Sequence, residues 1–334
     1  SNFTIADHAT PLYYRFIDAE NQSHSYGIYQ RVATPTDLKG EAATKEFLFQ
    51  QLFNDIAPKY FAYLRNDNRE DFIAASVSYT PLVRGYGQFA WDVVPYRGKD
   101  VPAVQQVLAE RARLLQPIPE RLFENAKQSL YDGMKQALDD EQNLGTPDNF
   151  FDQYRRNYLY STPLKELRAQ LQENIEQLVE LEVEDLQDWL QAKMGNTNNL
   201  AFVAYTASAQ EPAISQIEAE KLLVTTKAMG NAAEKQSDIA GNLIDFTLPQ
   251  GKIVREQRLS SLDAVEWTLS NGMKVIYKNL AKELKGEVLF LASAKGGQSI
   301  VKPRDLASFS AMQSLIMASG LYKYNRNQLA EWLR

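Results

Sequence analysis

The segment Trp267-Thr-Leu-Ser-Asn-Gly-Met-Lys-Val-Ile-Tyr-Lys278 decides the fold of the C-terminal part of the chain. Asn271-Gly272 is the strongest hairpin signal in the sequence, because both residues tolerate the positive φ angles of a tight turn. We therefore predict two antiparallel strands, over 265–269 and 274–278. A third strand is expected over 287–294. A helix is expected over 304–320, with these apolar side chains facing inward: Leu306, Phe309, Met312, Leu315 and Ile316.

A longer succession of elements precedes this hairpin. Alternating apolar residues predict strands over 24–32, 72–79 and 88–94, and the apolar segment 200–206 predicts a further buried strand. A long helix is expected over 38–64, because apolar residues recur there every three and four positions. The pattern predicts an α+β protein whose mostly antiparallel sheet is backed by long helices. The remaining helices are expected over 101–115, 119–142, 147–160, 163–180, 184–194 and 213–228.

Composition argues against several classes of protein. The 334 residues include 36 Lys+Arg against 42 Asp+Glu, and no block of basic residues suggests nucleic acid as a partner. No apolar segment approaches the roughly 18–20 residues that a membrane-spanning helix needs. Cysteine is absent, which excludes disulfides, thiolate nucleophiles and cysteine-based metal sites.

The supply of histidine limits the chemistry further. His8 and His24 are the two histidines of the chain, and neither has a second metal-type residue at helical spacing. A catalytic zinc commonly takes three protein ligands, and a Ser-His-Asp triad lacks its usual Gly-x-Ser-x-Gly turn here. We therefore predict no catalytic and no metal-binding residue in this chain.

The chain divides into four parts. Residues 1–20 are expected to form an N-terminal lead-in, in which Ser1-Asn2 look like the remnant of a purification tag. A complete domain is expected over 21–228. Residues 229–262, with scattered Gly, Pro and polar residues, are expected to connect the domains. A second domain is expected to begin at 263 and to be cut off at 334.

Two segments resemble the insulinase/pitrilysin-type zinc metallopeptidases, the inverzincins. Residues 267–278 and the segment Lys285-Gly-Glu-Val-Leu-Phe-Leu-Ala-Ser-Ala-Lys-Gly-Gly-Gln-Ser299 are similar to the opening of one domain of that family. The elements of 21–228 are similar to the family's second domain. The resemblance implies an α/β roll, present here as one complete domain and a partial second copy.

The resemblance also implies a function for the longer parent protein. Family members hold zinc in their first domain through His-x-x-Glu-His, and the glutamate activates water. That domain is not in this chain, and the corresponding positions of the 304–320 helix are Ala311, Ser314 and Leu315. We therefore expect a non-catalytic central fragment of a zinc metalloendopeptidase, itself inactive and without cofactor, that helps to form the substrate cavity and binds extended peptide. The alternative is a structural or assembly subunit whose peptidase site has decayed.

Four side chains are candidate contacts in such a cavity: Arg84, Tyr86, Tyr154 and Tyr158. Arg84 and Tyr86 lie in a loop bounded by proline and glycine, where binding residues often occur. The alternative is a solvated turn for the first pair and ordinary core packing for the tyrosines. Expected partners are a peptide or unfolded polypeptide, the parent's remaining domains and a second copy of the chain. The absence of cysteine favours a periplasmic or otherwise extracytoplasmic parent, with the cytoplasm as the alternative.

Overall fold

A computed structural model describes residues 4–36, 38–66, 70–140, 144–160, 162–227, 242–243, 245–247, 249–280, 288–326 and 328–329. The chain divides into two compact units, residues 1–237 and 238–334. The boundary between these units falls within the segment 229–262, most of whose first half lies outside the described residues. No helix in the described part of the chain combines the length and the apolar character that crossing a membrane requires.

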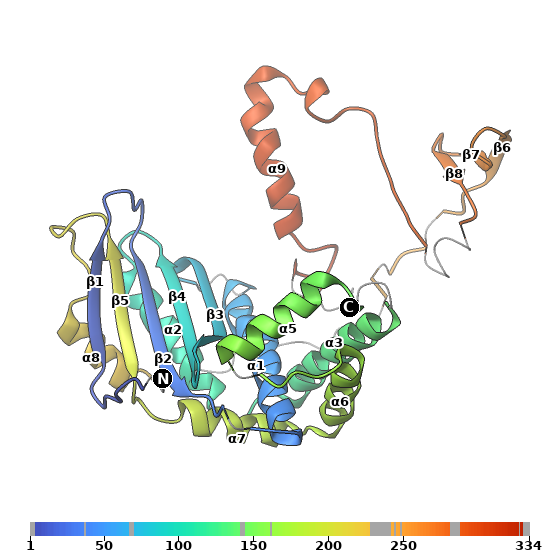
Figure 1. Ribbon diagram of the computed structural model, residues 1–334. Helices are drawn as coiled ribbons and strands as arrows, with labels where there is room; N and C mark the ends of the chain where they lie inside the picture. The colour runs from blue at the N-terminus through green and yellow to red at the C-terminus, as the bar shows by residue number, and fades with distance from the viewer. Residues whose placement is uncertain are drawn as a thin grey trace. The chain divides into compact units, whose positions relative to one another are not determined.

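The first unit contains a five-stranded sheet with the order β1-β5-β2-β4-β3 (Figure 1). Every neighbouring pair is antiparallel except β1 and β5, which run parallel. This arrangement confirms the predicted α+β class with an antiparallel-rich sheet. The strands are β1 (Leu12–Ile17), β2 (Ser25–Ala33), β3 (Phe72–Val83), β4 (Tyr86–Pro95) and β5 (Leu200–Thr206).

Strand β1 lies in the segment 1–20, where the sequence analysis predicted no strand. Its partner β5 is almost the whole unit away along the chain, and the pairing places Leu12 opposite Ala201. Exposed and half-buried side chains alternate from Leu12 to Phe16, but the exposed ones are large and apolar, so the sequence lacks the alternation of apolar and polar residues that marks a strand. A contact so distant in sequence leaves no local signal.

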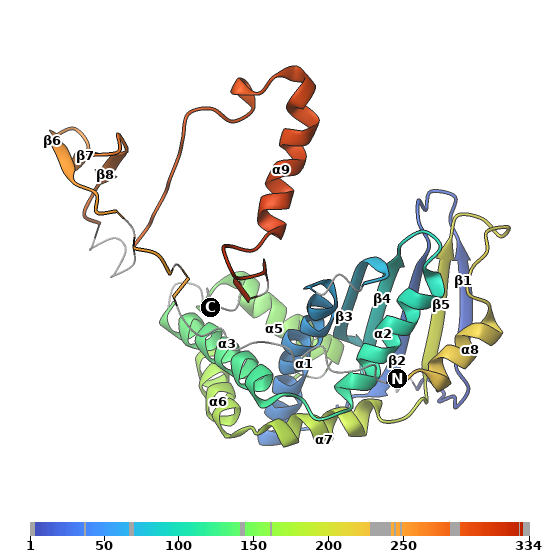
Figure 2. The ribbon, with the colours of Figure 1, turned by 180° about the vertical axis from the view of Figure 1, so that it is seen from behind.

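Helices cover one face of this sheet, and Figure 2 shows α1, α2 and α8 in front of the strands. The predicted apolar stripe of α1 is buried as expected, with Leu48, Leu52 and Phe53 in the core. Four predicted helices begin within one residue of the expected position, whereas α1, α6 and α8 begin three or four residues later than expected. The helices are α1 (Glu41–Asn66), α2 (Asp100–Leu114), α3 (Glu120–Asp139), α5 (Pro147–Tyr160), α6 (Leu167–Glu180), α7 (Val183–Met194) and α8 (Gln216–Thr225).

Aromatic rings gather where the sheet meets α1 and α7. The ring of Phe89, on β4, is fully buried at the centre of this cluster. Its centroid lies 4.8 Å from that of Phe53, 5.0 Å from that of Tyr79 and 5.7 Å from that of Trp189. These edge-to-face contacts join the first helix, two strands and α7 into one core.

A buried arginine joins α2 to the sheet. The Arg111 guanidinium donates hydrogen bonds to Gln30 Oε1 at 2.6 Å and to the Met194 carbonyl oxygen at 2.9 Å. It also lies over the ring of Trp91, 5.6 Å from the centroid. Burial lowers the pKa of Arg111 to about 10, so the group stays charged at neutral pH.

The second unit contains a three-stranded antiparallel sheet with the order β6-β7-β8. Its strands are β6 (Ile253–Leu259), β7 (Ala264–Leu269) and β8 (Lys274–Tyr277). The predicted hairpin at Asn271-Gly272 is confirmed: Gly272 has φ +84° and its N–H donates to the Leu269 carbonyl oxygen at 2.9 Å. Strand β6 lies within the segment that was expected to be a connector.

Two expectations for the second unit were wrong. No strand forms over 288–294, and Glu287 lies outside the described residues. A strand needs a partner with free backbone groups, and no described segment pairs with this one. The expected helix is present as α9 (Leu306–Ala318), after the 3-10 turns η2 (Gly297–Ile300) and η3 (Pro303–Asp305). Its apolar side chains do not face inward, because no described element covers them, and Leu315 is 65% exposed.

Candidate functional site

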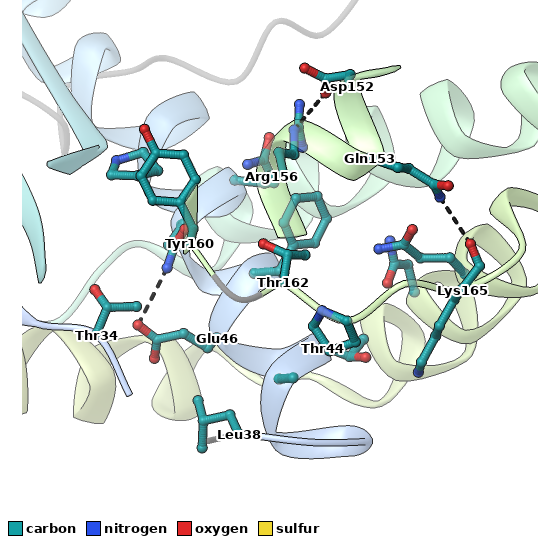
Figure 3. Close-up of a pocket in the computed structure, with 18 of the residues that line it drawn as sticks. Thr34, Leu38, Thr44, Glu46, Asp152, Gln153, Arg156, Tyr160, Thr162 and Lys165 are labelled. Carbon is teal, nitrogen blue, oxygen red and sulfur yellow. Dashed lines mark hydrogen bonds and ion pairs between the residues drawn. The ribbon is translucent and has the colours of Figure 1, made fainter. Parts of the chain in front are cut away.

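A pocket of about 750 Å³ lies in the first unit, between α1, the β3–β4 hairpin, α5 and α6 (Figure 3). We call it the side pocket. Its volume falls in the range of sites that bind small molecules or short peptide segments. The residues that line it include Thr44, Glu46, Phe47, Gln51, Asn54, Tyr79, Tyr86, Asp152, Gln153, Arg155, Arg156, Tyr160, Lys165, Gln170, Leu171 and Asn174.

One wall of the side pocket is the face of α1 that carries Phe47, Gln51 and Asn54. These residues are spaced four and three apart, so they lie one above another on the same side of the helix. The Asn54 carboxamide is bonded to the outer edge of β3. Its Oδ1 accepts from the Tyr79 backbone N–H at 2.7 Å, and its Nδ2 donates to the Tyr79 carbonyl oxygen at 3.0 Å. The side chain thus occupies the position that a neighbouring strand's peptide group would take.

The charged side chains of the side pocket are paired. Glu46 accepts from Trp189 Nε1 at 2.8 Å and lies 3.1 Å from Lys193 Nζ. Figure 3 shows Asp152 joined to Arg156, at 2.6 Å, and Gln153 joined to the backbone of Lys165. Hydrogen bonding from Arg155 holds the pKa of Asp152 below its usual range. Lys165 does the same for Glu173, which lies just outside the pocket.

The structure places two of the four predicted contact residues at the hairpin beside the pocket. Tyr86 lines the pocket; its hydroxyl accepts from the Ile5 backbone N–H at 3.2 Å, and the Arg31 guanidinium lies 4.9 Å from its ring centroid. Arg84 instead donates to the carbonyl oxygens of Tyr158 and Leu159. These carbonyls end α5, where a cation is favourable. Arg84 therefore ties the hairpin to α5.

The other two predicted residues lie on α5, away from the pocket. Tyr154 is 62% exposed and Tyr158 is 78% exposed, and neither lines the side pocket. The residues of α5 that line the pocket are instead Asn149, Asp152, Gln153, Arg155, Arg156 and Tyr160. That Tyr154 and Tyr158 contact a substrate stays a prediction.

Sequence reasoning missed the carboxamides of the pocket, although a signal was present. Gln51 and Asn54 interrupt the apolar pattern of the first helix, and Asn174 stands between Leu171 and Leu178 on α6. A polar residue at an apolar helical position is either bonded inside the protein or faces a cavity. The sequence shows which positions break the pattern, but it does not show which of the two explanations holds.

Outside the pocket, the imidazole of His24 lies between two carboxylates. Nδ1 is 2.6 Å from Asp100 Oδ1 and Nε2 is 3.2 Å from Glu211 Oε2. The Tyr26 hydroxyl also donates to Asp100, at 2.6 Å. The arrangement joins β2, the start of α2 and the loop after β5. No group of His, Asp and Glu side chains in the described ranges is arranged to hold a metal ion.

Acid is expected to remove the contribution of Glu211 to stability. The Ala207 backbone N–H, which donates to the carboxylate at 3.0 Å, and then His24 hold the pKa of Glu211 below its usual range. A pKa lowered by folding adds stability above the unfolded-state value, and this stability is lost as the pH falls through the folded-state value. We expect Glu211→Gln to lower the melting temperature at pH 7, and the difference from the wild type to shrink as the pH falls below the ordinary glutamate pKa and through the lower folded-state pKa of Glu211.

Melting curves of both proteins from pH 7 to pH 3 measure this effect. The control is Glu124→Gln, on the exposed side of α3, where the described residues offer the carboxylate no hydrogen bond or ion pair. It should melt with the wild type throughout. A difference for Glu211→Gln that persists unchanged at pH 3 would contradict the assignment.

Comparison with solved structures shows which proteins share this fold. The periplasmic protease PqqL from Escherichia coli matches with a TM-score of 0.56 and 16% identity, over 99% of this chain and 37% of PqqL. The ferredoxin protease FusC, solved as a mutant in complex with Arabidopsis ferredoxin, matches with a TM-score of 0.59 and 15% identity, over 97% of this chain and 36% of FusC. The chain has the fold of these proteases.

A third match links the fold to the family named from the sequence. A protein from Yersinia pestis, described as a predicted insulinase family protease, has a TM-score of 0.51 and 12% identity over 66% of this chain and 46% of its own. The predicted resemblance in fold is thus confirmed. The chain spans just over a third of the length of PqqL and FusC. No family model matches the sequence. The search of curated proteins also gave no match.

The residues of this chain do not fit the zinc that the resemblance implies for the parent. The resemblance implies that the positions of α9 equivalent to the His-x-x-Glu-His motif include Ala311 and Leu315, whose side chains have no atom able to bind a metal. His8 Nδ1 lies 2.8 Å from the Thr10 carbonyl oxygen, and both ring nitrogens of His24 face carboxylates. Neither histidine is placed beside a second one.

Proposed function

We propose that this chain is the non-catalytic, peptide-binding part of a zinc metalloendopeptidase of the insulinase family. The observation that carries the proposal is the match of nearly the whole chain to just over a third of PqqL and of FusC, both described as proteases. The catalytic zinc of the parent then belongs to a part of the polypeptide outside residues 1–334. The ferredoxin in the FusC structure supports a protein or peptide as the substrate.

The chain itself is expected to bind no stoichiometric zinc and to cleave no peptide. The test is metal analysis of the purified chain after exhaustive dialysis, together with a fluorogenic peptide assay. The same two measurements on the full-length parent should give one zinc per molecule and cleavage. One tightly held zinc in the chain alone, or a parent without zinc and without cleavage, would overturn the proposal.

Peptide would enter the parent as an extended segment along a sheet edge. The outer edge of β1 supports this mode, because β1 pairs with β5 alone among the described strands. Backbone hydrogen bonds to such an edge give affinity with little dependence on sequence. Arg84 and Tyr86 lie at the β3–β4 hairpin, on the other side of the sheet, so together with Tyr154 and Tyr158 on α5 they remain proposed contacts for a different part of the substrate.

We also propose that the apolar segment 288–291 pairs with another strand, either in the remaining domains of the parent or in a second copy of this chain. Its four side chains, Val288 to Leu291, are 79–91% exposed. An exposed apolar strand-like segment promotes association. For location we propose the periplasm or another extracytoplasmic space, supported by the description of PqqL as periplasmic. Recovery of the parent only with cytoplasmic markers would contradict this location.

A further inference from the structure

We propose that the side pocket binds an uncharged, amide-bearing segment of a polypeptide, such as one containing asparagine or glutamine, through the carboxamides of Gln51, Gln170 and Asn174. The inference rests on the proposed function, because it names the kind of peptide sequence that this part of a peptidase would hold.

Asn174 provides the first line of evidence. It lies on α6, is 5% exposed and lines the side pocket. Among the described residues, no donor or acceptor is hydrogen-bonded to its side chain. The polar atoms of its carboxamide are not among the fully buried, unpartnered side-chain atoms of the described residues, so they face the pocket, where a ligand can reach them. A ligand amide in the pocket would supply both the donor and the acceptor that this carboxamide lacks.

Gln51 and Gln170 provide the second line of evidence. Both are half-buried pocket residues, on α1 and α6, and within the described ranges neither side chain makes a hydrogen bond. The three unbonded carboxamides therefore come from two helices, α1 and α6, that both line the pocket. Each presents an N–H donor and a C=O acceptor side by side, which matches the same pair of groups on another amide.

Asn54, in the same wall of the pocket, shows that a carboxamide there can pair with the donor and acceptor of a peptide backbone. Its carboxamide exchanges two hydrogen bonds with the backbone amide groups of Tyr79, at 2.7 and 3.0 Å. Asn54 lies one helical turn from Gln51 on α1, so the unbonded carboxamide is adjacent to one that already recognises a peptide group. Phe47 and Leu171 add apolar surface for the carbon atoms of the bound segment.

The charges of the pocket favour a neutral ligand. Glu46, Asp152, Arg155, Arg156 and Lys165 each take part in an ion pair. A charged ligand group would have to give up its hydration without gaining an unpaired partner. Positive and negative charges are unequal where Arg155 and Arg156 share the single carboxylate of Asp152. Both arginine side chains are more than half exposed to solvent.

The experiment measures binding of short probes to the chain by isothermal titration calorimetry. The main probe is the blocked hexapeptide acetyl-Gly-Asn-Gln-Asn-Gln-Gly-amide; two others carry lysine or glutamate in place of the Asn and Gln residues. Maltotriose tests the other class of neutral polar ligand. We expect the amide peptide to bind, and the charged peptides and maltotriose to bind at least about tenfold more weakly.

The variant Asn174→Leu separates a ligand contact from a structural role. We expect it to weaken binding of the amide peptide about tenfold or more, because the ligand amide loses its partner. Its melting temperature should stay nearly equal, because the carboxamide has no partner among the described residues and is replaced by an apolar group of similar size. Gln172→Leu is the matched control: the same helix and a similar change at an exposed position outside the pocket, where binding should not change.

Three results would overturn the inference: no binding of the amide peptide, equal or stronger binding of a charged peptide or of maltotriose, or Asn174→Leu with a lower melting temperature and unchanged affinity. Failure of this inference about the side pocket can be distinguished from failure of the proposed peptidase function. A full-length parent that carries zinc and cleaves peptide, with a pocket indifferent to Asn174→Leu, refutes the pocket assignment alone. A pocket that binds as described in a parent without zinc or cleavage refutes the peptidase function alone.

Discussion

Phe89→Ala is expected to lower the free energy of unfolding by about 3–5 kcal/mol, which is the usual loss for a fully buried phenylalanine. The ring is fully buried and contacts Phe53, Tyr79 and Trp189 from three other elements. Its removal leaves a cavity that rigid neighbouring rings cannot fill. Urea denaturation followed by far-UV circular dichroism measures the change.

The control for this experiment is Phe151→Ala on α5. The same side chain is removed, but Phe151 is 69% exposed, so the change should stay within about 0.5 kcal/mol. Equal effects of the two substitutions would mean that the aromatic cluster is not the core of the first unit.

Arg111→Ala is expected to lower the free energy of unfolding by about 3 kcal/mol, because hydrogen bonds from a charged donor to buried acceptors are lost. The acceptors are Gln30 Oε1 and the backbone oxygens of Met194 and Asn196, and the first two are buried. No water reaches them to replace the guanidinium without opening the packing between α2, α7 and β2. The contact with the ring of Trp91 is lost as well.

Arg111→Lys provides the comparison. Lysine keeps the charge, but its side chain is shorter than the one that brings Arg111 Nη2, the donor of all three bonds, to the acceptors, so we expect a loss smaller than that of alanine but clearly measurable. Denaturation curves in urea at pH 7 give both values. A lysine variant as stable as the wild type would show that the position of the Nη2 donor does not matter and that a positive charge is sufficient at this site.

Local patterns were sufficient to predict most elements of the fold. The turn at Asn271-Gly272 and the apolar stripe of α1 were predicted because the determining residues are neighbours in sequence. The start of α6 was not predicted correctly. The expected helix began at Pro163, whereas the observed one begins at Leu167. The segment before it is held instead by tertiary contacts: Asn157 Nδ2 donates to the Thr162 carbonyl oxygen, and Gln153 Nε2 donates to that of Lys165.

The candidate site was harder to predict than the fold. Tyr86 was chosen because it lies in a turn rich in glycine, and it does line the side pocket. Asn174 and Gln51 lie more than a hundred residues apart on separate helices, so no spacing in the sequence connects them. Their shared property, a carboxamide without a partner among the described residues, exists only after the helices have packed.

The pairing of the first strand with the last bears on how the first unit folds. Strand β1 finds its place only beside β5, so the sheet is not complete until residues 200–206 have left the ribosome. Closing so long a loop is slow, and β5 has an open edge until it happens. Synthesis would therefore pass through a stage in which four strands are paired and the leading segment is still loose. Chaperones that capture exposed strand edges would have their best opportunity at that stage.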